Sequence, residues 1–541
     1  MGASRPTNIG LVFDRHAEAR RQTVMLLDRP FDIAPDGGTR YDGAALADLV
    51  HQASNWLYAA GLRRGQKVGI VKDNHFDMLI LTAAAARIGA LPAELAPLAS
   101  LASVQGMLRN LRPDLLVAST TMLQRAAKAG TTLAEPGIRT IAVPSLDPTA
   151  PEAPEGTIPL SDLLGSPTAP VNFRPDDEPM IITHSSGTTG VPKLVVNSGS
   201  TILGAGARME TIRFPVVASR RTDVVGTSFT YAHARSVSWT AGQLTLAPTA
   251  LSIISDPSLD NAARALAEHR PTTLEACPNI FQRWEELADN RPELFEQVRL
   301  YVGTFDAVHP RTVRKFLGAS KTKHPIWGQS WGQSEVGPVC AAFFTRRSIA
   351  KTDKPTSVTN DIGWTVPFLA KVRVVDPLTG RRQPRGKPGI LMVSTRARCI
   401  TYLGEEDRHT EKVDGEWWNT GDVGTRGWLG RMRLEDREVD TIPGGSSIEL
   451  ESVLLDRLER AIDVTLLGVP DQDPIPVLCM RDNELDPADW KRATEDLPPL
   501  AEPLLVPWEQ VPRTATWKVR RLELREQLLG TSAAVGTGRW T

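Results

Sequence analysis

A hydroxyl- and glycine-rich segment, residues 181–196, has the residue types best suited to chemistry in this sequence. Its glycines would let the backbone approach an anion closely, and its hydroxyl and N–H groups would donate hydrogen bonds to that anion. Lys193 adds a positive charge for phosphate oxygens. The segment therefore predicts a loop that binds phosphate.

The residues on both sides of this segment argue against two other interpretations. A cluster of Ser, Thr and Gly is commonly a flexible linker, but the apolar runs on both sides have the composition of buried strands. A Walker-type loop ends in Gly-Lys-Ser/Thr. Here Pro192 precedes the lysine and Leu194 follows it, so the sequence excludes a Walker-type loop.

An aromatic and glycine-rich segment, residues 327–335, is a second candidate for nucleotide binding. An aromatic ring can stack on adenine, a glycine permits close approach, and a carboxylate can hold Mg²⁺ against a triphosphate. The residues that fit these roles are Trp331, Gly332, Ser334 and Glu335. Taken alone, the segment is better interpreted as an ordinary loop with a glutamate that faces solvent.

Two further segments add a carboxylate and a lysine. Asp422 ends residues 416–422, and its two carboxylate oxygens can each accept a hydrogen bond from one hydroxyl of a diol. Lys518 lies in the basic run 511–521, and its compact ammonium suits negative charge that develops on phosphorus. Gly-Asp pairs are common in turns and basic runs are usually solvated, so neither segment is decisive alone.

In their order and approximate spacing these four segments resemble the motifs of the AMP-forming adenylating enzymes, a superfamily that includes acyl-CoA synthetases, adenylation domains of peptide synthetases, and luciferases. The resemblance covers almost the entire chain. It implies an α/β fold, with a large N-terminal domain of layered α/β subdomains plus a β-rich subdomain over residues 1–437. A small mobile α+β C-terminal domain, residues 438–541, would carry the catalytic lysine.

The resemblance also implies a role for each segment. The hydroxyl-rich loop would handle the β- and γ-phosphates of ATP, Glu335 the Mg²⁺ ion, and Lys518 the reacting centre. Asp422 and Arg437 would contact the ribose. The predicted catalytic residues are Lys518, Thr183, His233 and Glu335. The predicted nucleotide-binding residues are Ser185, Ser186, Gly187, Thr188, Thr189, Gly190, Lys193, Phe305, Asp306, Trp331, Gly332, Ser334, Asp422 and Arg437.

Several positions depart from the family pattern. Phe305 and Asp306 replace smaller residues in the segment that the family places beside adenine, which should reshape that wall of the pocket. Trp517 stands where glycine is usual, next to the predicted catalytic lysine. At the hinge, Val439 replaces the usual Asp or Lys. His233 lies where the family has a residue beside the substrate carboxylate, and a structural histidine is an equally good interpretation.

The resemblance implies an AMP-forming ligase that adenylates a carboxylic acid with ATP, releases pyrophosphate and passes the acyl group to CoA or to a carrier-protein thiol. Aromatic residues near His233 hint at an aromatic or flat acid. The altered hinge leaves other outcomes open: an ATP-dependent diazotase that activates nitrite for an aryl amine, a ligase that stops at the adenylate, or an inactive nucleotide-binding homologue.

Composition limits the function classes. The 541 residues suggest two or more domains, and 41% hydrophobic with 23% charged residues is typical of a globular protein. A formal net charge of -1 gives no global attraction to nucleic acid or to anionic membranes. The N-terminus lacks a signal-peptide core and no run has membrane length, so a cytoplasmic protein with buried, unpaired cysteines is expected.

Hydrophobic patterning predicts alternating strands and helices from about residue 39 to residue 303, and hence a largely parallel sheet. Beyond about residue 357 the pattern changes to strands. A helix is predicted over residues 448–462, followed by a strand at residues 464–469 and a polar helix at residues 487–494.

Overall fold

The computed structural model describes residues 7–133, 135, 137–145, 153–185, 191–212, 216–350, 357–437, 442, 446–469, 472–514 and 516–530. These residues form two compact units. The first draws on residues 1–273, 333–337 and 396–411. The second draws on residues 274–332, 338–395 and 412–541.

An eight-stranded sheet dominates the first unit. Its order is β19-β9-β8-β4-β3-β5-β6-β7. The strands are β3 (Lys67–Val71), β4 (Leu91–Glu94), β5 (Leu115–Ser119), β6 (Arg139–Val143), β7 (Ile158–Pro159), β8 (Pro179–His184), β9 (Leu194–Ser198) and β19 (Thr401–Tyr402). Strands β8, β4, β3, β5, β6 and β7 run parallel to their neighbours, whereas β9 and β19 pair antiparallel at one edge. The predicted largely parallel sheet is confirmed.

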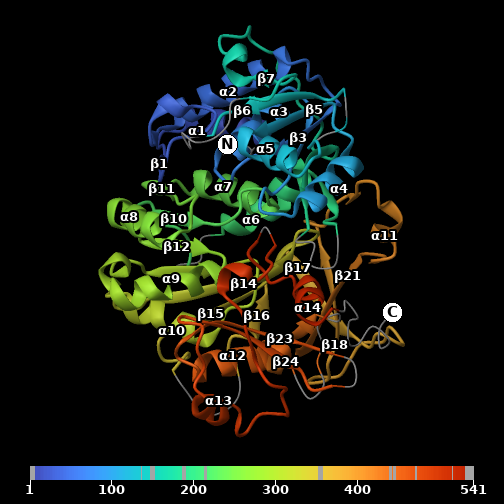
Figure 1. Ribbon diagram of the computed structural model, residues 1–541. Helices are drawn as coiled ribbons and strands as arrows, with labels where there is room; N and C mark the ends of the chain where they lie inside the picture. The colour runs from blue at the N-terminus through green and yellow to red at the C-terminus, as the bar shows by residue number, and fades with distance from the viewer. Residues whose placement is uncertain are drawn as a thin grey trace. The chain divides into compact units, whose positions relative to one another are not determined.

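Helices connect the parallel strands, as the alternating pattern predicts. They are α2 (Gly43–Ala59), α3 (Asp77–Arg87), α4 (Leu101–Leu111) and α5 (Thr120–Lys128), which Figure 1 shows around β3, β5 and β6. Helix α2 starts where the side chain of Asp42 accepts a hydrogen bond from the Ala45 N–H, and it ends before Gly61, whose φ of 91° is readily accessible to glycine. Leu108 and Leu111 of α4 pack against buried strand residues.

A second sheet region of the first unit contains β10 (Val224–Ser228), β11 (Ala250–Ile253) and β1 (Val24–Leu27) in parallel, with β2 (Arg40–Tyr41) antiparallel at the edge. Its helices are α1 (Val12–Ala17), α6 (Ala207–Glu210), α7 (Ala234–Leu246) and α8 (Leu259–His269). A π-helix spans Ser200–Gly206, and α11 spans Glu406–Thr410. Phe229, Tyr231 and Trp239 are fully buried and pack on one another, which indicates that these aromatic residues belong to the hydrophobic core.

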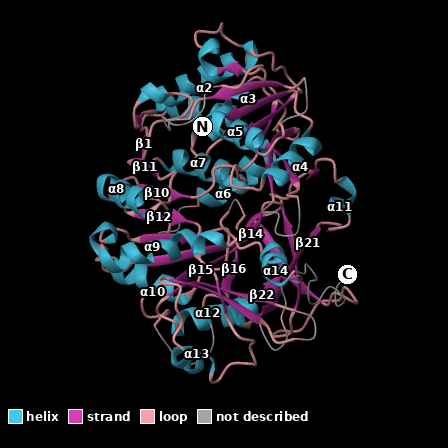
Figure 2. Cartoon of the chain, in the orientation of Figure 1, coloured by secondary structure: helices cyan, strands magenta, loops and turns pink. Residues whose placement is uncertain are grey.

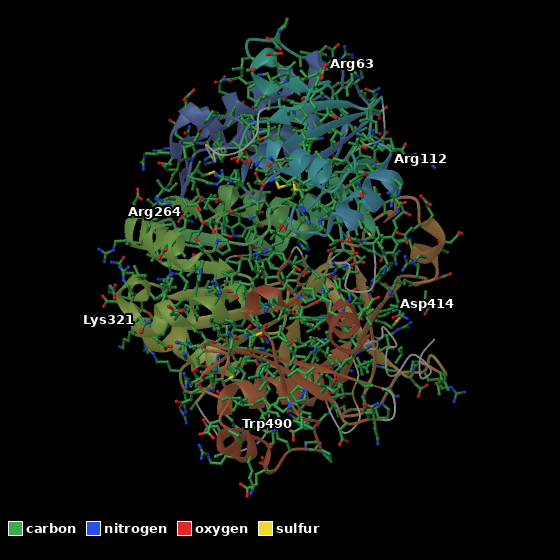
Figure 3. The ribbon with its side chains drawn as sticks, viewed as in Figure 1. Arg63, Arg112, Arg264, Lys321, Asp414 and Trp490 are labelled. Carbon is green, nitrogen blue, oxygen red and sulfur yellow. The ribbon has the colours of Figure 1, made fainter. Side chains whose placement is uncertain are left out.

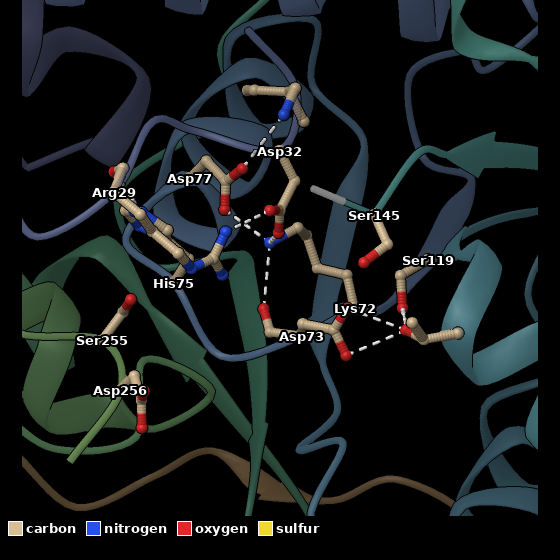
Figure 4. A network of polar contacts seen from close by, with 12 residues as sticks. Arg29, Asp32, Lys72, Asp73, His75, Asp77, Ser119, Ser145, Ser255 and Asp256 are labelled. Atoms are coloured by element: carbon tan, nitrogen blue, oxygen red, sulfur yellow. Dashed lines mark hydrogen bonds and ion pairs between the residues drawn. The ribbon is translucent and has the colours of Figure 1, made fainter. Parts of the chain in front are cut away.

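A buried cluster of charged residues lies between β3 and α3 (Figure 4). The ammonium of Lys72, 0% exposed, lies 2.6 Å from Asp77 Oδ1 and 2.6 Å from Asp32 Oδ2, and it donates to the Asp73 carbonyl at 2.9 Å. Burial alone would lower the pKa of Lys72, but the two carboxylates raise it, so the lysine stays charged. Arg29 pairs with the other oxygen of Asp32.

Strands outnumber helices in the described part of the second unit, and Figure 2 shows several of them in the region from β14 to β22. Their order is β17-β18-β21-β22-β16-β15-β14-β13-β12. The strands are β12 (Thr273–Ala276), β13 (Leu300–Gly303), β14 (Ile326–Gln333), β15 (Gly337–Phe344), β16 (Asp361–Thr365), β17 (Ala370–Val375), β18 (Gly389–Thr395), β21 (Trp417–Arg426) and β22 (Met432–Arg437), with β20 (Val413–Asp414) paired to β21. Helices α9 (Pro278–Asn290) and α10 (Pro310–Ala319) accompany them, and the predicted change toward strands is confirmed.

The last part of the second unit contains the sheet β23 (Ala461–Leu467), β24 (Ile475–Met480) and β25 (Leu504–Leu505). Its helices are α12 (Ser447–Arg457), α13 (Pro487–Thr494) and α14 (Arg521–Leu529). The helix predicted over residues 448–462 is therefore too long, because Ala461 and Ile462 belong to β23. The guanidinium of Arg311 explains the break, since it donates to the carbonyls of Leu455 at 2.7 Å and Ala461 at 2.8 Å.

The predicted α/β class is confirmed. The predicted boundary between residues 437 and 438 stays a prediction. All four cysteines are buried and none of them forms a disulfide, as expected. Among the described residues, no helix is long and apolar enough to cross a membrane.

Candidate active site

The hydroxyl-rich segment connects two antiparallel strands of the first unit. Thr183 and His184 at the end of β8 pair with Val195 and Leu194 of β9, so the predicted strands on both sides of the loop are confirmed. Ser185 and Lys193 are hydrogen-bonded to each other where the strands end and the loop begins. The Ser185 N–H donates to the Lys193 carbonyl and the Lys193 N–H donates to Ser185 Oγ, each at 3.0 Å.

The loop residues predicted to bind phosphate, Ser186, Gly187, Thr188, Thr189 and Gly190, lie outside the described residues, as does Val439 of the hinge. The predicted catalytic residue Thr183 is fully buried in β8, and its hydroxyl has no hydrogen-bond partner among the described residues. Its role stays a prediction.

A polar chain joins the hairpin to Glu335 within the first unit. The ammonium of Lys193 lies 5.1 Å from the centre of the Tyr402 ring, a cation–π distance, and the Tyr402 hydroxyl donates to Glu335 Oε1 at 2.6 Å. Burial and the neighbouring charge of Glu335 raise the pKa of Tyr402, so the phenol is the proton donor of this bond. The structure thus brings two predicted site residues together through a tyrosine for which the sequence predicted no site role.

The predicted Mg²⁺ ligand fits the chemistry of this ion. Magnesium usually binds one or two carboxylates and completes its octahedron with water and substrate phosphates. In the described part of the chain, no group of three His, Cys, Asp or Glu side chains is arranged to hold a metal by itself. A single buried carboxylate, Glu335, is therefore the donor set expected for Mg²⁺ that arrives with ATP.

His233, Ser334 and His184 form a second polar chain in the first unit. The Arg235 N–H donates to His233 Nδ1 at 3.0 Å at the start of α7, so Nε2 carries the proton and donates to Ser334 Oγ at 3.1 Å. Ser334 Oγ in turn lies 3.5 Å from the His184 carbonyl. Burial lowers the pKa of His184, whose Nε2 accepts from the Ala96 N–H at 3.1 Å. This chain connects the segment of Glu335 with the end of β8.

The predicted ribose-binding residues converge in the second unit. Asp422 on β21 pairs in register with Arg437 on β22. The Arg437 Nε–H donates to Asp422 Oδ1 at 3.3 Å, and the Trp331 Nε1–H donates to Oδ2 at 3.1 Å. A carboxylate accepts hydrogen bonds and does not donate them, so Asp422 has the chemistry to bind the two hydroxyls of a diol. Trp331 lies on strand β14 and not in a loop, and the neighbouring Gly332 is exposed.

Lys518 lies at the end of a tight turn in the second unit. Its N–H donates to Thr514 Oγ1 at 3.1 Å, and its carbonyl accepts from the Thr514 N–H at 2.7 Å. The preceding residue, Trp517, has a φ of 65°, a left-handed conformation that favours the glycine usual at this position. Its ring stacks on Trp508, with 5.5 Å between centroids and 24° between planes, and its carbonyl accepts a hydrogen bond from Asn279. The stack on Trp508 and the hydrogen bond from Asn279 therefore both fix the position of this turn.

The carboxylate of Asp306 lies beside this lysine. It lies between β13 and α10, and its Oδ1 is 3.8 Å from Lys518 Nζ. Phe305 before it has a φ of 84°. The structure therefore brings together two predicted site segments that are far apart in the sequence.

Sequence reasoning missed Tyr402, His184 and Asn279 as site residues. Tyr402 carries a usable signal, because Tyr402-Leu-Gly is a segment that matches the family. His184 lies within the hydroxyl-rich segment 181–196, whereas Asn279 lacks such a signal, since its contact with Trp517 depends on how distant segments pack.

Comparisons with known proteins identify similar sequences and a similar fold. The sequence model of the family described as "AMP-binding enzyme" matches residues 13–403. A 3-amino-2-hydroxy-4-methoxybenzoate diazotase of Streptomyces cremeus is 36% identical over 545 residues, which cover 97% of this chain and 96% of that protein. A 4-coumarate–CoA ligase 2 of Oryza sativa subsp. japonica is 24% identical over 76% of this chain and 72% of that protein. The crystal structure of the anthranilate CoA ligase AuaEII in complex with anthranoyl-AMP has a TM-score of 0.79 at 17% identity, over 97% of this chain and 98% of that one.

Proposed function

Because the chain belongs to the family of AMP-binding enzymes, we propose that it activates nitrite with ATP and uses the activated nitrogen to diazotise an aryl amine. The protein is an AMP-forming ligase with the adenylate-forming fold. The observation behind the choice of nitrite is the diazotase of Streptomyces cremeus, 36% identical to this chain along nearly its whole length. The CoA ligases among its relatives are about as distant as the 24% identical coumarate ligase.

In the proposed first step an oxygen of nitrite attacks the α-phosphorus of ATP and pyrophosphate leaves. The protein mainly positions anions and neutralises their charge. Lys193 and the hydroxyl-rich loop bind the β- and γ-phosphates, and Asp422 fixes the ribose. Glu335 would hold Mg²⁺, which supplies positive charge to the phosphate oxygens when bound. Lys518 places its ammonium beside the α-phosphate oxygens, where negative charge develops.

In the second step the aryl amine attacks the activated nitrogen and AMP leaves. The N-nitroso product rearranges to a diazohydroxide, which loses water to give the diazonium ion. This reaction uses no thiol, which is consistent with the departure of Val439 from the family hinge.

A second candidate keeps the same first step with a carboxylate in place of nitrite. The acyl adenylate then passes to CoA or to a carrier-protein thiol. The coumarate–CoA ligase and the other CoA-ligase relatives of this chain favour this candidate. It shares every residue role of the first step, so only the products separate the two functions.

Substrate-dependent exchange of pyrophosphate into ATP tests the proposal. Nitrite should support exchange, and a panel of aromatic acids should support less of it. With an aryl amine present, nitrite should yield a diazonium that couples to 2-naphthol as a coloured dye. Exchange with an aromatic acid and formation of its CoA thioester, without any dye, would instead establish the second candidate.

A further inference from the structure

Asp306 introduces a negative charge beside the lysine that handles the reacting centre. The family pattern has smaller residues in this segment, so the carboxylate is a feature of this chain. Its Oδ1 lies 3.8 Å from Lys518 Nζ, and the side chains of Asp306 and Lys518 are 33% and 24% exposed. Both residues belong to the second unit.

The geometry of this pair is not that of a structural ion pair. A separation of 3.8 Å is too long for a hydrogen bond, and a partly solvated pair of this kind contributes little to stability. By contrast, Arg513 and Asp463 of the same unit lie 2.6 Å apart, with side chains that are 7% and 8% exposed. Asp306 and Lys518 are therefore close enough to contact neighbouring groups of one substrate, and no direct hydrogen bond ties them to each other.

The loop around Asp306 is held in a defined conformation. Phe305 adopts a φ of 84°, which is unfavourable for a residue with a large side chain and persists only where the surrounding structure enforces it. The Ala307 N–H donates to Asp306 Oδ1 at 3.0 Å, and the preceding Thr304 hydroxyl donates to Glu275 at 3.1 Å. The carboxylate is thereby directed before any substrate arrives.

We propose that Asp306 is a catalytic residue that accepts a hydrogen bond from the amino group of the aryl amine and takes the proton that this nitrogen loses. The inference rests on the proposed diazotase function. As the N–N bond forms, the bond between the activated nitrogen and the phosphate oxygen breaks, and its electron pair leaves with AMP next to Lys518. One amine proton passes to Asp306. The same proton then returns to the diazohydroxide oxygen, which departs as water and leaves the diazonium ion.

A carboxylate suits this role because a neutral aryl amine has N–H groups to donate and a carboxylate only accepts. Holding one N–H bond would also aim the lone pair of the amine at the electrophilic nitrogen. Proton transfer by a positioned group contributes about 10²–10⁴-fold to a rate. Asp306 should therefore matter more for the second step than for the formation of the adenylate.

The two half-reactions of the Asp306→Asn variant test this division. Dye formation from 3-amino-2-hydroxy-4-methoxybenzoate should fall about 10²-fold, at least tenfold more than pyrophosphate exchange with nitrite alone, which reports any loss of nucleotide binding. In Asp306→Ala, added formate should restore part of the dye formation, because a small carboxylate can take the missing place. A merely structural role would not produce rescue by formate.

Asp414→Asn is the matched control, since it also removes the carboxylate of a cation pair. Asp414 lies at the surface (Figure 3), 2.7 Å from Arg373, with a side chain that is 73% exposed. Both half-reactions should be unchanged in this variant. Equal loss of exchange and dye formation in Asp306→Asn, or full dye formation, would overturn the inference while the diazotase function stands. A wild-type protein that makes no dye would overturn the proposed function itself.

Discussion

Lys72 and Lys518 both lie beside aspartates, and the two sites differ in burial and in distance. Lys72 is fully buried and lies 2.6 Å from each of two carboxylates (Figure 4). Lys518 is 24% exposed and lies 3.8 Å from one carboxylate. The protein itself compensates the charge of Lys72. The carboxylate near Lys518, by contrast, is one that a substrate can replace.

The comparison teaches that a lysine that stabilises the fold and a lysine that we propose to act in the reaction differ in their geometry. Burying an ammonium is costly unless carboxylates compensate it at hydrogen-bond distance, as they do at Lys72. A lysine that must bind a phosphate cannot be compensated in this way, because its donors would already be occupied. Substitutions at the two positions should therefore fail in different ways.

Lys72→Met should have the largest effect. It would leave Asp77 buried without this cation and Asp32 with Arg29 alone, and removing one partner of a buried ion pair typically costs about 3–5 kcal/mol. Urea unfolding measures this loss. The control is Lys371→Met, which removes an exposed lysine 3.6 Å from Glu416 and should change the free energy of unfolding by less than about 1 kcal/mol. Equal stability of the two variants would contradict the structural role of Lys72.

Lys518→Ala should lower pyrophosphate exchange about 10²–10³-fold, the usual loss when one charge-stabilising donor is removed from a transition state. The free energy of unfolding should change by less than about 1 kcal/mol, because the pair with Asp306 is long and partly solvated. Lys321→Ala is the control, since Lys321 lies at the surface with a side chain that is 74% exposed (Figure 3). Exchange at the wild-type rate in Lys518→Ala would contradict a role of Lys518 in adenylation, and with it the contrast between Lys518 and Lys72.

His75 should make the Lys72 cluster sensitive to acid. Burial, together with the positive charges of Arg29 and Lys72, lowers the pKa of His75 to about 3. The unfolded chain binds a proton near pH 6.5, so between pH 6.5 and pH 3 it binds more protons than the folded chain does. His75 therefore contributes stability that is complete above pH 6.5 and decreases as the pH falls.

The His75→Gln variant measures this contribution. Its free energy of unfolding should fall less steeply with acid than that of the wild type, by up to about 1.4 kcal/mol per pH unit in this window. The comparison of slopes is independent of any constant loss that the substitution causes at every pH. Parallel curves for the two proteins would show that His75 is as readily protonated in the folded state as in the unfolded chain.

Trp517→Gly should have the smallest effect on stability. It relieves a left-handed conformation that costs about 1–2 kcal/mol and loses an aromatic stack worth about 0.5–1.5 kcal/mol, so the two changes largely cancel. The looser turn should slow exchange about three- to tenfold, because small displacements of Lys518 weaken its contact with the phosphate.

Trp428→Gly is the control for this variant. Trp428 is 74% exposed, so its substitution should leave exchange unchanged. Trp508→Ala keeps Trp517 but removes its stacking partner, and it should slow exchange to a similar extent. Faster exchange in Trp517→Gly would show that the tryptophan hinders the lysine and does not position it.

Local sequence patterns were sufficient for much of the fold and for the choice of site segments. Alternating apolar runs predicted the strands and helices of the first unit, because each element buries its own apolar face. Glycine, hydroxyl and charged residues marked the segments of Lys193, Glu335, Asp422 and Lys518. Such features depend on a few consecutive residues.

The features that the sequence did not predict depend on distant residues. Helix α12 ends at Arg457 because Arg311, far away in the chain, binds carbonyls that a longer helix would use. The bond from Tyr402 to Glu335 and the approach of Asp306 to Lys518 likewise join segments that no local pattern connects. Packing decides such contacts, and a single sequence contains no direct record of it.

Transfer of ¹⁸O from labelled nitrite tests the central claim most directly. If an oxygen of nitrite attacks the α-phosphorus, breakage of the N–O bond in the second step leaves that oxygen on AMP. In the presence of ATP and 3-amino-2-hydroxy-4-methoxybenzoate, mass spectrometry should find one ¹⁸O in AMP, none in pyrophosphate, and no labelled AMP with Lys518→Ala. Unlabelled AMP from the wild type, or label in pyrophosphate, would contradict the adenylation of nitrite by this protein.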